Sequence, residues 1–143
     1  GDYSKTVFEP IDEYKGDLAR TFFYLVTAYE EDLLSWRSDQ LGGSFYPGIS
    51  EWSLELLLKW HREDPVSLKE VRRNEEIFKI QGNRNPYIDY PDLVEYVWGV
   101  LVEEPFKVDN LADSYFLIEC SPFERWLQRQ QWYDNILILL QKN

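Results

Sequence analysis

Between Gly16 and Trp36, apolar side chains recur at spacings of three and four residues. The series consists of Leu18, Phe22, Leu25, Val26, Tyr29, Leu33 and Trp36. Because an α-helix turns once every ~3.6 residues, this spacing predicts one helix over residues 16–36 with these side chains on a single buried stripe. Asp17, in the first turn, suits the positive end of the helix dipole.

Start and stop signals predict four further helices. Ser50 is predicted to cap a helix that ends before Pro65, because a proline disfavours helix at the residue before it. Ser67 and Glu70 form a capping-box pattern, and the helix that follows ends at Gly82. Pro91 suits the first position of a helix that Gly99 ends. A second capping box, Ser121 to Glu124, opens a long last helix.

The helix between Ser67 and Gly82 has two unlike faces in the sequence. Its apolar residues are Leu68, Val71, Ile77, Phe78 and Ile80, and its opposite face carries Lys69, Arg72, Arg73, Glu76 and Lys79. This pattern is typical of a helix that packs through its apolar side.

The predicted elements define a mainly α fold. About five helices are expected in one domain over residues 1–143, with at most two short strands near residues 100–118. The length of 143 residues suits a single domain. No run approaches the roughly 20 apolar residues of a membrane span, and residues 1–10 lack the apolar core of a signal peptide.

The charge is unevenly distributed along the chain. The formal net charge is −11, which disfavours bulk attraction of nucleic acid. Residues 59–84, however, contain seven basic and five acidic side chains, so this stretch carries +2 and the remainder carries −13. A surface that meets a polyanion is therefore expected in the middle third of the chain.

The connector after Gly82 is rich in side chains that bond to nearby backbone. Asn83, Asn85 and Asp89 are predicted to form a structural turn, because Asn and Asp side chains bond readily to neighbouring main-chain groups. Arg84 within this turn has two interpretations. It either contacts nucleic acid or serves as a strut of the loop.

No catalytic residue and no metal ligand are assigned in this chain. His61, Asp64 and Ser67 lie too close in sequence, across a proline-broken helix end, to place two partners on opposite nitrogens of the imidazole. With one histidine and one cysteine, only an all-oxygen metal site could form, and the acidic residues are scattered. A histidine near an apolar helix face is more often a core or capping residue.

Two long segments resemble a known family. They are FEPIDEYKGDLARTFFYLVTAYEEDLLSW, residues 8–36, and LLKWHREDPVSLKEVRRNEEIFKIQGNRNPYIDYPDLVEYVWG, residues 57–99. They resemble the bacterial endonuclease I family of secreted or periplasmic non-specific nucleases. The resemblance makes residues 1–99 an endonuclease I-like segment. Residues 100–143 are left as an unassigned C-terminal extension with the long last helix.

The resemblance implies a chemistry whose residues are not expected in this chain. In that family a ββα-metal arrangement uses a histidine base and one divalent ion, Mg²⁺ or another, and those residues are expected to precede the segment seen here. The chain then resembles the helical half that shapes the nucleic-acid groove. On this basis Lys15, Arg20, Arg73 and Arg84 are the candidate contacts to nucleic acid.

Two functions from different classes follow. The first is the helical portion of a metal-dependent nuclease that hydrolyses phosphodiesters of DNA, with RNA as an alternative, and that is inactive as this isolated chain. In that case nucleic acid is bound only through a full-length protein, and the location is secreted or periplasmic by resemblance. The alternative is a non-catalytic helical module derived from the same family, with a protein partner bound through residues 100–143.

Overall fold

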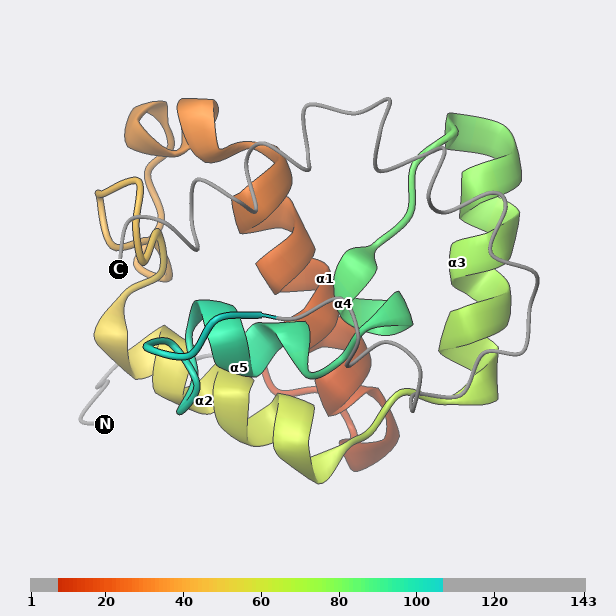
Figure 1. Ribbon diagram of the computed structural model, residues 1–143. Helices are drawn as coiled ribbons and strands as arrows, with labels where there is room; N and C mark the ends of the chain where they lie inside the picture. Colours follow the sequence, from red (N-terminus) through yellow and green to blue (C-terminus); the bar gives the residue numbers. More distant parts are fainter. Residues whose placement is uncertain (1–7, 107–143) are drawn as a thin grey trace.

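The computed structural model describes residues 8–106, which form a mainly α fold as predicted. The α-helices are α1 (Lys15–Ala28), α2 (Glu51–Glu63), α3 (Leu68–Gln81), α4 (Pro86–Asp89) and α5 (Leu93–Val97), with the 3₁₀ helices η1 (Asp12–Tyr14) and η2 (Glu30–Ser35) (Figure 1). Within residues 8–106 the only strand-like pairing is an isolated bridge between Leu41 and Ile49. None of the helices described has the length and apolarity of a membrane-spanning segment.

The core lies where α1 meets α2 and the short helices α4 and α5. Phe23 of α1 is fully buried and stacks on Trp98, with ring centroids 4.8 Å apart. Tyr87 of α4 meets Phe23 edge-on at 6.1 Å and hydrogen-bonds through its hydroxyl to Thr27 at 2.7 Å. Aromatic pairs of this kind stabilise a core beyond the area that they bury. The rest of this core comprises Ala19, Val26, Leu33, Ile49, Leu57, Leu58, Trp60, Leu93, Val94 and Val97.

The predicted stripe of the first helix is confirmed in part, because Val26 and Leu33 lie in the core, but its length and several of its positions are wrong. Leu18 and Tyr29 are 38% and 49% exposed, whereas Arg20 and Phe23 have no exposed surface. The helix ends at Ala28, and η2 follows instead of a continuation to Trp36. Because α1 contacts both α2 and α4, and because partners from distant segments satisfy its buried polar groups, the apolar positions alone did not mark its inner face.

The helix boundaries are set largely by the signals in the sequence. The capping box is present, with the Ser67 hydroxyl accepting from the Glu70 amide and Glu70 accepting from the Ser67 amide. Gly82 ends α3 with φ 74°, in the left-handed region that favours glycine. Ser50 does precede α2, but its hydroxyl donates to the carbonyl of Asp39 and makes no cap bond.

The connector between Gly82 and Pro91 contains a short helix, α4, where the sequence predicts a structural turn. Asn85 caps α4 by accepting from the Tyr87 amide, and Pro86 is its first residue. The next helix begins at Leu93, two residues later than expected from Pro91. Residues 100–103 form turns, and residues 100–106 contain no strand. Residues 107–118, the second capping box and the predicted long last helix lie outside the described residues.

Helix α3 does not pack through its apolar side. Leu68 and Ile80 are 76% and 85% exposed, and the buried residues of α3 are Glu70 and Asn74, both polar. The expected orientation is therefore wrong. The helix is held by hydrogen bonds and ion pairs to α1 and to the connector, whose geometry a hydrophobic pattern does not encode.

Candidate nucleic-acid interface

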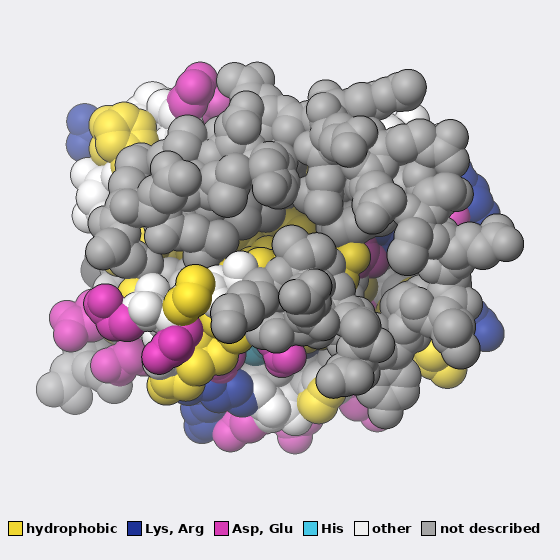
Figure 2. All heavy atoms as spheres, viewed as in Figure 1, with side chains coloured by type: hydrophobic (Ala, Val, Ile, Leu, Met, Phe, Trp, Pro, Cys, Tyr) yellow, Lys and Arg dark blue, Asp and Glu magenta, His cyan; other side chains and the backbone are white. Residues whose placement is uncertain are grey.

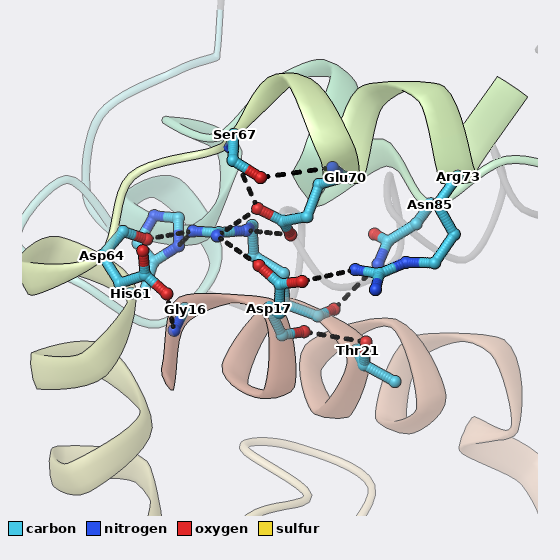
Figure 3. Close-up of polar contacts among 10 residues, drawn as sticks. Gly16, Asp17, Thr21, His61, Asp64, Ser67, Glu70, Arg73 and Asn85 are labelled. Atoms are coloured by element: carbon cyan, nitrogen blue, oxygen red, sulfur yellow. Dashed lines mark hydrogen bonds and ion pairs between the residues drawn. The ribbon is translucent and has the colours of Figure 1, made fainter. Parts of the chain in front are cut away.

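A buried ion pair joins α1 to α3. Arg20 donates from Nε to Oε1 of Glu70 at 2.8 Å and from Nη2 to Oε2 at 2.5 Å, and neither side chain is exposed (Figure 3). Its remaining terminal nitrogen, Nη1, donates to the carbonyl of Asp64 at 2.8 Å. Burial raises the pKa of Glu70, and the hydrogen bonds from Arg20 act in the opposite direction by favouring the carboxylate. The guanidinium of Arg20 is thus occupied on every side by protein acceptors.

Gly16 lets the start of α1 approach the end of α2. Its amide donates to Oδ2 of Asp64 at 2.9 Å. A Cβ at this position would lie 2.0 Å from the carbonyl oxygen of Asp64, so a larger residue would force the two helices apart. This close approach brings the Asp64 carbonyl within reach of Arg20.

Asp17 connects the buried pair to the surface of α3. Its Oδ2 accepts from Nη2 of Arg73 at 2.6 Å, and its Oδ1 lies 3.8 Å from Nη2 of Arg20 (Figure 3). The side chain of Asp17 is 10% exposed and that of Arg73 is 43% exposed. Arg73 is therefore held at the surface by a largely buried carboxylate.

The predicted structural turn bonds to α1 and to α3. The backbone amide of Asn85 donates to Oδ1 of Asn74 at 2.8 Å, and the side-chain Nδ2 of Asn85 donates to the carbonyl of Arg20 at 2.9 Å. Nδ2 of Asn74 donates to Oδ1 of Asp89 at 3.1 Å. Asn83 donates to the Tyr24 hydroxyl at 2.9 Å. These bonds fix the connector between the two helices.

Arg84 is placed as a strut of this turn. It donates from Nε and Nη2 to the two carboxylate oxygens of Asp89, each at 2.7 Å, and from Nη1 to Glu75 at 2.5 Å. Its side chain is 12% exposed. The hydrogen bonds to Asp89, more than the one to Glu75, raise the pKa of Arg84 above its ordinary value.

The four predicted contact residues occupy different environments. Arg20 has no exposed surface, and Arg84 is engaged by two carboxylates. Lys15 is 16% exposed and paired with Glu9 at 2.6 Å and Asp12 at 2.8 Å. Only Arg73 of the four combines substantial exposure with a single ion pair within residues 8–106. The position of Arg20 does not fit a direct contact with nucleic acid.

Two exposed basic residues of α3 that lack an acidic partner within residues 8–106 were not among the predicted contacts. Lys69 and Arg72 lie on the outer side of the helix, and neither has a carboxylate within ion-pair distance among residues 8–106. Their position on the face opposite the predicted apolar side was visible in the sequence. Their lack of acidic partners was not visible in the sequence, because it depends on the carboxylates of α3 pairing with other cations in the fold.

His61 is a buried residue of α2 and is 8% exposed. Nη1 of Arg20 lies 3.4 Å from its Nδ1, and Phe23 meets its ring edge-on. Burial, reinforced by the charge of Arg20, lowers the pKa of His61 to about 4. The Asp64 carboxylate bonds to Gly16 and the Ser67 hydroxyl caps α3, so neither pairs with the imidazole as a triad would require.

Protonation of His61 is expected to destabilise the fold in mild acid. Its pKa is about 4 in the folded chain, below the ordinary value near 6.5, so the unfolded chain binds the proton more tightly. The free energy of unfolding therefore has its full value above pH ~6.5 and decreases as the pH falls. The decrease reaches roughly 2 kcal/mol at pH ~5. Urea unfolding of the chain and of His61→Gln is measured above pH ~6.5 and at pH ~5. The free energy of unfolding should decrease less in the variant than in the unchanged chain. An equal loss in both would contradict the assignment.

The residues described do not provide a metal site. Within residues 8–106 no group of three or more His, Cys, Asp or Glu side chains is arranged to hold an ion. The buried carboxylates of Asp17 and Glu70 accept hydrogen bonds from Arg73 and Arg20.

The fold and this polar network define a helical module with a basic outer helix, and sequence comparison gives its family. A family model described as Endonuclease I matches residues 1–92, and the chain belongs to this family. No solved structure gives a significant match.

Curated relatives carry nuclease names. An extracellular ribonuclease of Bacillus amyloliquefaciens is 42% identical over 102 residues, covering 67% of this chain and 34% of the relative. Endonuclease-1 of Buchnera aphidicola subsp. Baizongia pistaciae is 32% identical over 87 residues, covering 61% and 29%. An extracellular deoxyribonuclease of Aeromonas hydrophila is 32% identical over 75 residues, covering 52% and 26%. The chain thus spans about a third or less of the length of these relatives.

Proposed function

We propose that this chain forms the helical part of a secreted, metal-dependent endonuclease that hydrolyses nucleic-acid phosphodiesters, and that it does not cleave on its own. The observation that carries the proposal is the family match over residues 1–92 together with 42% identity to an extracellular ribonuclease about three times as long as the matched segment. The proposed metal, Mg²⁺ or another divalent ion, would be held by residues outside the described part of the chain.

The geometry supports a buttressing role for these residues. The Arg20–Glu70 pair, the Asp17–Arg73 pair and the Asn74–Asn85 bonds fix α3 against α1. A rigid frame of this kind is what a nuclease needs to hold a strand in register with its catalytic groups, because misplacement by ~1 Å can lower the rate about 100-fold. Secretion is proposed from the extracellular relatives.

The proposal is tested by a chimaera. The segment of the Bacillus amyloliquefaciens ribonuclease that matches this chain is replaced by the matching residues of this chain, and RNA cleavage is measured with and without EDTA. We expect the chimaera to cleave RNA and to lose that activity with EDTA. The isolated 143-residue chain, assayed on RNA and on plasmid DNA with Mg²⁺, is expected to be inactive.

Two outcomes would count against this function. A folded chimaera without activity would favour the alternative, a helical module kept for binding a protein. Cleavage by the isolated chain would contradict the claim that its catalytic residues lie elsewhere. Circular dichroism of the chimaera separates a lost function from a lost fold.

A further inference from the structure

Three exposed basic residues lie together on the first half of α3. Lys69, Arg72 and Arg73, here called the basic triplet, are all exposed. Lys69 precedes the two arginines by three and four residues, a spacing that places side chains on one side of a helix. Figure 2 shows dark blue side chains at the right-hand edge of the molecule, where Figure 1 places α3.

The acidic residues of α3 leave the basic triplet unneutralised. Glu70 is buried against Arg20, Glu75 accepts from Arg84, and Glu76 pairs with Lys79 at 2.8 Å. Each carboxylate of the helix is thus committed to a cation outside the triplet. The triplet presents positive charge although the chain as a whole carries −11.

Within residues 8–106 the triplet itself has few partners. Nζ of Lys69 donates to the Tyr14 hydroxyl and lies 4.3 Å from the centroid of its ring, which orients the ammonium without neutralising it. Arg72 makes no hydrogen bond or ion pair with the residues described. Arg73 is held by one nitrogen on Asp17. Its other donors have no partner in the same range of residues, so the guanidinium is oriented yet able to bind an anion.

Other cations of this region are less suited to bind an external anion. Arg62 is bonded to both carboxylate oxygens of Glu95, at 2.7 and 2.9 Å, and Arg84 and Lys15 each meet two acidic residues. An external phosphate would have to displace those carboxylates. At the triplet only one such pair, Arg73 with Asp17, exists among residues 8–106.

We propose that the basic triplet binds the phosphodiester backbone of a nucleic-acid strand. The inference rests on the proposed function and replaces three of the four contacts predicted from sequence, namely Lys15, Arg20 and Arg84. It also replaces the expectation that nucleic acid is bound only through a full-length protein, because the triplet is complete within this chain. Guanidinium groups match phosphate oxygens with paired hydrogen bonds, and each phosphate neutralised by a side chain releases condensed counterions. Binding through the triplet is therefore strongly dependent on salt and indifferent to base sequence.

The test compares two charge-matched variants of the 143-residue chain. In the first, Lys69→Gln is combined with Arg72→Gln, which spares the Asp17–Arg73 pair. In the second, Arg37→Gln is combined with Lys59→Gln, two exposed basic residues outside α3. Binding of a short fluorescein-labelled single-stranded oligonucleotide is followed by fluorescence anisotropy over a series of salt concentrations. Urea unfolding checks that both variants keep the stability of the unchanged chain.

We expect the α3 variant to bind more weakly and to lower the slope of log K against log salt by roughly 1.4, about 0.7 for each phosphate that is no longer neutralised. The control variant should keep the slope of the unchanged chain. Equal decreases in both variants would show that bulk charge, not the triplet, governs binding, and an unaltered slope in the α3 variant would overturn the proposal. Undetectable binding by the unchanged chain at low salt would also overturn it.

These failures are distinguishable from failure of the proposed function. An active chimaera together with an unaltered salt slope would retain the nuclease proposal and reject the triplet. A folded but inactive chimaera would reject the nuclease proposal whatever the oligonucleotide titration shows.

Discussion

Glu70→Ala is expected to destabilise the chain by about 3 to 5 kcal/mol, the usual cost of leaving one partner of a buried ion pair without its counter-charge. Arg20 is fully buried and donates two hydrogen bonds to Glu70, at 2.8 and 2.5 Å. The same substitution also removes the carboxylate that accepts from the Ser67 amide at the start of α3. The measurement is the midpoint of urea unfolding, followed by circular dichroism near neutral pH.

A matched control is Glu76→Ala, which removes an exposed carboxylate from the same helix and its ion pair with Lys79. Exposed pairs of this kind contribute little, so no measurable change is expected. A second variant combines Glu70→Leu with Arg20→Met and should be more stable than Glu70→Ala, because both buried charges are removed together. If Glu70→Ala unfolded at the same urea concentration as Glu76→Ala, the buried pair would not be holding α3.

Phe23→Ala is expected to cost about 3 to 5 kcal/mol of unfolding free energy, since it removes a large, fully buried aromatic ring. The ring stacks on Trp98 and meets Tyr87 and His61 at their edges, so its removal leaves a cavity bordered by several elements. Urea unfolding gives the free energy, and tryptophan fluorescence should report the altered surroundings of Trp98.

Leu18→Ala is the informative comparison, because the sequence pattern places Leu18 on the buried stripe and the structure leaves it 38% exposed. We expect its cost to be well under half that of Phe23→Ala, because truncating a partly exposed side chain removes less buried apolar surface. Similar costs for the two variants would support the stripe inferred from sequence and contradict the orientation of α1.

The local signals in the sequence predicted most helix ends because they act within a few residues. The capping box of Ser67 and Glu70 and the left-handed Gly82 are fixed by neighbouring backbone groups. The missed helix α4 also begins with a local signal, the Asn85 cap followed by Pro86. From sequence alone that signal predicts a turn, because a single helical turn has no apolar period to mark it.

The sequence by itself determined the helical class, the principal helix boundaries, the family resemblance and the +2 charge of residues 59–84. Only the tertiary structure decided which face of α3 is buried, which positions of α1 are buried and which cations are left without a carboxylate. Arg20 was predicted to contact nucleic acid, yet its guanidinium is buried and donates hydrogen bonds to Glu70, 50 residues away in the sequence. Arg72 was not among the predicted contacts, yet it is exposed and has no acidic partner within residues 8–106. Pairing between charges far apart in the sequence depends on how α1 packs against α3. Neither residue spacing nor composition predicts that packing.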